Sequence, residues 1–148
     1  MALANNELYS ENSRAGLPAI QPANGPGALI PRTFGSGTDL LPVGMPVCIV
    51  PTTGLLDVCD PDQSSTNLHE LVVYGFVYPA PIQRVNGSEV IGTVMVKGSI
   101  DYAVIKAHLT QLSGTEQQLK DMLRNKDVQA RGLFIDNLTK AGGNTGLS

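Results

Sequence analysis

Two histidines are the residues of this chain best suited to acid–base chemistry. Histidine changes its protonation state near neutral pH, so a histidine-based catalytic site would have to use His69 or His108. His69 follows a polar loop and is expected to be solvated, whereas His108 stands in an apolar segment and is expected to be a hydrogen-bonded packing residue. Neither belongs to a nucleophile motif, so we predict no catalytic residue and no enzymatic activity.

Metal and nucleotide sites are also not expected. The two cysteines and two histidines form no C-x-x-C or H-x-x-x-H element, which a structural zinc site normally contains. Asp60 and Asp62 resemble the start of a calcium loop, but Ser65 and Leu71 stand where that loop needs glycine and glutamate. The glycine-rich stretch 35–38 lacks the lysine of a phosphate-binding loop. We therefore predict no metal and no cofactor, and a solvated acidic turn at 60–62.

The two cysteines are expected to remain reduced. Apolar runs at 46–50 and 55–59 flank a turn, and a hairpin of these runs places Cys48 opposite Asp57. Cys48 and Cys59 are then diagonal neighbours with Cα atoms about 7–8 Å apart. A disulfide prefers a Cα separation of about 5.5–6 Å, so the pattern favours two half-buried thiols.

Composition excludes several classes of partner. The net charge is −3 and charged residues make up 16% of the chain, without the basic patch of a nucleic-acid-binding protein. No apolar run approaches the roughly 18 residues that span a bilayer, and the N-terminus does not resemble a secretory signal. We predict no nucleic-acid or membrane partner, and synthesis in a cytoplasm.

The elements that would position a site are short strands followed by two helices. A glycine within the third strand, Gly75, predicts a bulge or a close approach of another backbone. Ser99 is expected to cap the first helix, and Ser113 with Glu116 has the spacing of a capping box for the second. The pattern predicts a β-rich α+β domain with helices near the C-terminus. The expected strands are 46–50, 55–59, 70–78, 90–97 and 132–135, and the expected helices are 101–109 and 116–126.

The first 41 residues differ from the rest. Prolines and glycines recur through residues 16–41, which disfavours a regular helix or a central strand. We therefore divide the chain into an extended arm at 1–41, a domain at 42–140 and a tail at 141–148. Composition leaves two interpretations of the arm open, because it could lie on another surface or wrap over its own domain. Its candidate anchors are Leu17, Ile20, Leu29, Ile30 and Phe34.

One further feature concerns self-association. Tyr74, Phe76 and Tyr78 alternate along one face of an expected strand. No basic residues stand between them, which argues against a base-stacking platform. The three side chains are candidates for the sheet core or for a subunit interface.

Several segments together resemble the lambda-type head decoration proteins of tailed bacteriophages. The stretch 92–101, GTVMVKGSID, resembles the strand–glycine–acid passage that leads into a helix in that family. The stretches 41–47 and 54–56 resemble its opening hairpin, and 74–78 resembles its central strand with a glycine. The stretch 131–135 resembles its closing strand, whereas the arm here is longer than is usual for the family.

The resemblance implies a β-clip-like domain that forms a homotrimer on the outside of an expanded capsid. It implies that the N-terminal arm pairs with a strand of the major capsid protein, and that the protein resides on the virion without cofactor or catalysis. Two other functions remain open. One is another virion structural protein, such as a tail or head-completion subunit. The other is a small hydrolase or ligand-binding domain that uses His69 with the Asp60 and Asp62 loop.

Overall fold

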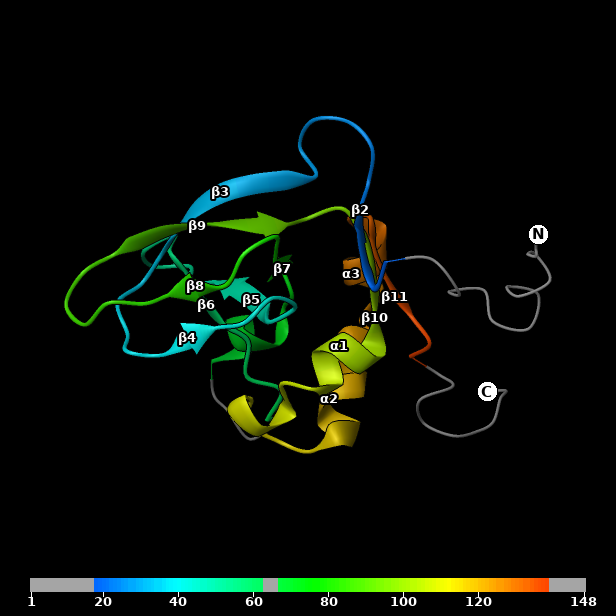
Figure 1. Ribbon diagram of the computed structural model, residues 1–148. Helices are drawn as coiled ribbons and strands as arrows, with labels where there is room; N and C mark the ends of the chain where they lie inside the picture. The colour runs from blue at the N-terminus through cyan, green and yellow to red at the C-terminus, as the bar shows by residue number, and fades with distance from the viewer. Residues whose placement is uncertain (1–17, 63–66, 139–148) are drawn as a thin grey trace.

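The computed structural model describes residues 18–62 and 67–138. Within these residues the protein is a β-rich α+β fold, as predicted, with a closed barrel, two small sheets and three short helices. Figure 1 shows the barrel on one side of the molecule, and the three-stranded sheet with the helices on the other.

Five strands close the barrel in the order β3-β6-β5-β7-β9. The longest ladder joins β3 to β9, which pair antiparallel from Leu29 opposite Met95 to Phe34 opposite Val90. Closure comes from β3 and β6, which pair in parallel where Phe34 lies opposite Leu56. The barrel strands are β3 (Leu29–Phe34), β5 (Pro46–Ile49), β6 (Leu56–Val58), β7 (Gly75–Val77) and β9 (Val90–Met95).

The second sheet has the order β11-β10-β2, so β10 lies between two edge strands. Strand β2 runs antiparallel to β10 and strand β11 runs parallel to it. A further two-stranded sheet joins β4 to β8. These strands are β2 (Ile20–Pro22), β4 (Leu40–Leu41), β8 (Ile82–Gln83), β10 (Gly98–Asp101) and β11 (Leu133–Asp136).

Three helices replace the two that the sequence predicts. The second expected helix is interrupted after α2, and the Asn125 side chain accepts a hydrogen bond from the Asp127 amide to begin α3. The expected caps were also wrong, because Asp101 rather than Ser99 caps α1 and Thr115 with Gln118 forms the capping box of α2. The helices are α1 (Tyr102–Lys106), α2 (Glu116–Leu123) and α3 (Lys126–Ala130), with 3₁₀ turns at Leu68–Leu71 and Leu109–Gln111.

The strand expected at 70–78 forms only over Gly75–Val77. Its first residues instead continue the 3₁₀ turn, where the Val72 amide donates to the His69 carbonyl. At Gly75 the backbone of β7 lies close to that of β9. A Cβ atom at position 75 would lie 2.6 Å from the Met95 carbonyl oxygen, so only glycine allows this approach. The prediction of a close backbone approach at this glycine is therefore confirmed.

The predicted cysteine hairpin is confirmed. Strands β5 and β6 pair antiparallel with Cys48 opposite Asp57. Both thiols are free, but they are fully buried rather than half-buried as predicted. Burial raises the pKa of Cys59 well above its ordinary value, and the neighbouring Cys48 thiol raises it further. Both cysteines thus belong to the apolar interior.

The predicted arm boundary at residue 42 is wrong, because residues 20–41 supply β2, β3 and β4 to the domain. Prolines are compatible with β2 and β3 because their nitrogen atoms point away from the strand with which each pairs. The Val96 amide donates to the Ala28 carbonyl, so residue 28 and every second residue after it in β3 direct their backbone groups toward β9. Pro31 lies between these positions, so its nitrogen atom faces away from β9. The Ala23 amide likewise donates to the Lys97 backbone carbonyl, so the neighbouring Pro22 nitrogen atom faces away from β10. Each proline thus occupies a position where its ladder needs no donor.

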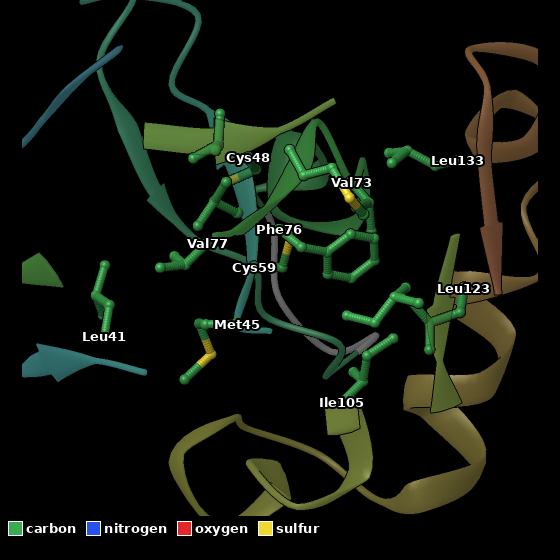
Figure 2. Packing of buried hydrophobic residues seen from close by; sticks show 14 of the residues in the cluster. Leu41, Met45, Cys48, Cys59, Val73, Phe76, Val77, Ile105, Leu123 and Leu133 are labelled. Carbon is green, nitrogen blue, oxygen red and sulfur yellow. The ribbon is translucent and has the colours of Figure 1, made fainter. Parts of the chain in front are cut away.

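One core connects the barrel to the helices and to the three-stranded sheet. Phe34 from β3 and Tyr102 from α1 are both fully buried in it. Figure 2 shows barrel residues of this cluster, such as Cys48, Phe76 and Val77, together with Ile105 and Leu123 from the helices and Leu133 from β11. The barrel and the sheet therefore share one hydrophobic core within the described residues.

Gly98 is expected to be intolerant of any side chain. Its φ is +141°, and a Cβ atom there would lie 2.5 Å from the Gln21 carbonyl oxygen and 2.8 Å from Pro22 Cα. Replacement by alanine should therefore separate β2 from β10 and cost about 2–3 kcal/mol of unfolding free energy, measured by urea denaturation. Gly25→Ala is the matched control, because Gly25 also has a positive φ but a Cβ atom there would meet nothing within 4 Å. Equal losses from the two substitutions would contradict the packing argument.

Candidate functional site

The predicted arm anchors do not form one exposed surface. Ile20 and Phe34 are 8% and 0% exposed and belong to the core, so the prediction that they bind a capsid is wrong. Leu29 is 39% exposed and Ile30 is half-buried, both on β3. Leu17 lies outside the described residues. Of the predicted anchors that the structure describes, Leu29 is the one with an exposed side chain.

The aromatic residues predicted as an interface belong largely to the barrel. Phe76 is fully buried, which excludes it from a subunit contact. Tyr74 and Tyr78 are half-buried against the core. The Arg32 guanidinium donates to the Tyr74 hydroxyl over 2.9 Å and lies 5.0 Å from the centre of its ring. This contact joins β3 to the segment that enters β7.

The two histidines lie in different surroundings, and the turn that carries His69 adjoins the acidic loop, because the Asp60 amide donates to the Glu70 carbonyl over 3.0 Å. His108 lies 2.8 Å through Nε2 from the Val43 carbonyl oxygen, which confirms its predicted role as a hydrogen-bonded packing residue. His69 belongs to the 3₁₀ turn, and the Asp60 side chain accepts a hydrogen bond from the Asp62 amide. Residues 63–66 of the acidic loop lie outside the described residues. Across 18–62 and 67–138, no cluster of three histidine, cysteine or acidic side chains is placed to hold a metal.

The outer face of the three-stranded sheet is the strongest candidate for a binding surface. The register places Gln21 and Phe134 on either side of Ser99, and alternation directs these three side chains to the same face. Phe134 is 47% exposed, although phenylalanine is usually buried in a domain of this size. The opposite face of the sheet carries Ile100 and Leu133, which are buried in the core. The sheet is therefore covered on one face and accessible on the other.

Two hollows flank Phe134. One of about 300 Å³ lies toward β2, where it is lined by Gln21, Pro22 and Ser99 among others. The second, of about 410 Å³, lies along β11 between that strand and the ends of α2 and α3. Its lining includes Leu123, Arg124, Gln129, Ile135 and Leu138. Both hollows combine apolar and polar side chains.

A polar network fixes the helices beneath this sheet. The Tyr102 hydroxyl donates to Glu116 over 3.0 Å, and the Lys106 and Lys120 ammonium groups lie 3.4 and 3.7 Å from the same carboxylate oxygen. The hydrogen bond from Tyr102 lowers the pKa of Glu116, and the two lysines lower it further. Burial raises the pKa of Tyr102, so its hydroxyl remains a donor through neutral pH. The network therefore joins α1 to α2.

A second network fixes the two-stranded sheet to the barrel. Arg84 donates to both carboxylate oxygens of Asp39 and, over 2.9 Å, to Asp57 of β6. Hydrogen bonding to Arg84 lowers the pKa of Asp39. The Arg84 side chain is only 11% exposed, so its three hydrogen bonds compensate for the loss of water around the charge. Arg84, Asp39 and Asp57 pair with one another and stabilise the fold, so they do not form a separate binding site.

Tyr102→Phe is expected to change how stability depends on pH. Because folding lowers the pKa of Glu116, this carboxylate stabilises the protein above its ordinary pKa, and the stabilisation is lost as pH falls through the folded-state pKa. Without the hydroxyl, we expect a loss of about 1 kcal/mol at pH 7 and a smaller decline between about pH 5 and pH 3. Urea denaturation at each pH measures both effects. A parallel shift of the whole pH curve would contradict the assignment, and Tyr78→Phe serves as the control.

Comparison with known proteins places the chain in no family. No family model matches it, and no curated protein sequence matches it. Among the residues that the structure describes, none of the helices combines the length and apolar character needed to cross a lipid bilayer.

Sequence reasoning did not identify Phe134 as a surface residue. Strand β11 was expected over nearly the same residues, and its alternation of Leu133, Phe134 and Ile135 could have indicated one outward aromatic side chain. The partner strand β2 could not be anticipated, because its residues were assigned to the arm. The surface becomes visible only when β2, β10 and β11 are placed side by side.

Proposed function

We propose that the protein decorates and stabilises the head of a tailed bacteriophage. In this proposal it binds the outside of the expanded capsid as a homotrimer, with the major capsid protein as its partner. It is synthesised in the host cytoplasm and resides on the virion exterior, without cofactor or catalysis. The observation that carries the proposal is the passage from β9 into α1. There β9 is followed by the short strand β10, which begins at Gly98 and ends at Asp101, and the Asp101 side chain accepts a hydrogen bond from the Ala103 amide in the first turn of α1.

The other segments that carry the resemblance are consistent with this function. The segment 41–47 leads into a hairpin of β5 and β6, and β7 begins at Gly75 and pairs with β5. The chain then returns through α2 and α3 to β11, which pairs with β10. These are arrangements of backbone and apolar side chains, which suits a protein that acts by binding.

The structure changes how an arm would act. Residues 20–41 are occupied within the domain, so the segment left to contact the shell is the leader, residues 1–17. Leu17 remains a candidate anchor in that leader, whereas Leu29 is a candidate on the surface of β3. Three leaders on one trimer would bind together, so that modest individual contacts give slow dissociation.

The leader is tested by removing residues 1–17. We expect the truncated protein to keep the solution mass of the full chain and to lose most of its binding to empty expanded heads, measured by co-sedimentation. The control is the full chain carrying Leu29→Ala, which tests the exposed β3 residue separately. Undiminished binding of the truncated protein would contradict a role for the leader. A hexameric or dodecameric ring in solution would favour a tail or head-completion subunit.

A further inference from the structure

A hollow of about 400 Å³ lies where the end of α3 meets the segment that enters β7 and the turn between β9 and β10. Two of its lining residues are cationic, and both are exposed. We call this feature the cationic hollow. Its lining residues are Tyr74, Val96, Lys97, Ala130 and Arg131.

Contacts within the fold hold the two cations at this hollow. Arg131 donates through Nη2 to the Val73 carbonyl, which places the guanidinium beside Tyr74 and leaves its other N–H groups available to a ligand. The side-chain stem of Lys97 packs against Gly132, where a Cβ atom would lie 3.3 Å from Lys97 Cγ. Because Gly132 directly follows Arg131, the two cations lie on the same wall.

Arg32 adds a third positive charge next to the hollow. Its guanidinium donates to the Tyr74 hydroxyl over 2.9 Å and to the Gly54 carbonyl over 3.2 Å. The Tyr74 oxygen accepts this hydrogen bond, so the hydroxyl hydrogen is available to a ligand, and no acceptor for it is present among the described residues. The hollow therefore offers a hydroxyl donor beside its two cations.

No acidic side chain of residues 18–62 and 67–138 forms an ion pair with Arg32, Lys97 or Arg131. Other cations of the described chain lie 2.7–3.7 Å from a carboxylate oxygen, namely Arg84, Lys106, Lys120 and Arg124. Positive charges gathered without a counter-charge repel one another, so an anion bound in the hollow lowers their electrostatic energy. The cationic hollow is therefore complementary to a negatively charged ligand, although the whole chain has a net charge of −3.

We propose that the cationic hollow binds an acidic segment of a partner protein, whose carboxylates pair with Lys97 and Arg131. A carboxylate suits these donors, because a guanidinium and a hydroxyl group can bond its two oxygens together. Val96 and Ala130 supply an apolar wall for the methylene groups of an acidic side chain. A nucleic acid is disfavoured, because a phosphate backbone requires a longer track of cations than one hollow. The inference goes beyond the proposed function and does not depend on it, since the site lies on a single chain.

The test is an NMR titration with a blocked synthetic peptide, Gly-Leu-Glu-Glu-Leu-Gly, and with a control peptide that has glutamine in place of both glutamates. We expect saturable binding of the acidic peptide, with shifts at the Tyr74, Lys97 and Arg131 amides. Lys97→Gln should weaken this binding by at least about fivefold, because its exposed ammonium has no ion pair within the described fold. Lys126→Gln is the matched control, since Lys126 also lacks a carboxylate partner but does not line the hollow.

Equal affinity of the two variants, equal binding of the two peptides or no binding of the acidic peptide would overturn the inference. Tighter binding of a short oligothymidylate would overturn it in favour of a nucleic acid. A lower solution mass for Lys97→Gln would also overturn it, because the hollow would then face another copy of this chain. If Lys97→Gln does not fold, the unaltered protein decides: raising salt from about 0.05 M to about 0.5 M should weaken binding of the acidic peptide by at least about fivefold, and unchanged affinity would reject the site.

Discussion

A chain that lacks residues 1–40 is expected not to fold, whereas a chain that lacks residues 1–17 is expected to fold normally. The first deletion removes β2 and β3, and β3 supplies six residue pairs to β9 as well as the closure of the barrel. It also removes Ile20 and Phe34 from the core. A domain of this size has a total stability of only about 5–15 kcal/mol, so the loss of a barrel strand exceeds what it can tolerate.

Circular dichroism and cooperative thermal unfolding distinguish the two truncations. The protein without residues 1–17 should retain a sharp transition, because all the described strands remain. The protein without residues 1–40 should show no cooperative transition and should aggregate, because β9 is left with an open edge. A folded, soluble protein after the longer deletion would show that residues 18–40 are an arm, and would contradict the fold described above.

Phe34→Ala is expected to destabilise the protein by about 3–5 kcal/mol. Phe34 is fully buried in the cluster that joins the barrel to the rest of the core, so truncation removes apolar contacts and leaves a cavity. Leu29→Ala on the same strand should cost less than about 1 kcal/mol, because the Leu29 side chain is 39% exposed. The contrast separates a core residue from a surface residue within the predicted arm.

Urea denaturation measures both free energies. If Phe34 were an anchor for another protein, its substitution would leave stability unchanged and would reduce binding to heads alone. Similar costs for Phe34→Ala and Leu29→Ala would likewise contradict the burial of Phe34. The difference between the two unfolding free energies therefore tests whether Phe34 belongs to the domain rather than to an arm.

Local patterns were sufficient to predict β5, β6, β9 and β11 and the place of β7, whereas β8 and β10 were not predicted. The β5–β6 hairpin followed from two apolar runs around a turn, and its register was confirmed at Cys48 opposite Asp57. The close approach at Gly75 and the packing role of His108 were also predicted. These features depend on neighbouring residues or on one side chain, which sequence alone describes well.

Residues 18–41 were wrongly predicted to be part of an arm because their structure depends on distant partners. Pro22 and Pro31 disfavour a strand when neighbouring residues alone are considered. Both fit within strands because β10 and β9 pair with alternate residues and leave the proline nitrogen atoms facing outward. This alternation is set by tertiary register, which no local pattern reveals. The same dependence hid the candidate surface around Phe134.

Co-sedimentation of the full chain with empty phage heads tests the central proposal most directly. Under the proposal a tailed phage encodes this chain. Its heads should be stripped of decoration protein and compared before and after expansion. The proposal predicts saturable binding to expanded heads, in multiples of three copies at each local threefold position, and little binding to unexpanded heads. Absence of binding to expanded heads, or equal binding to both forms, would contradict it.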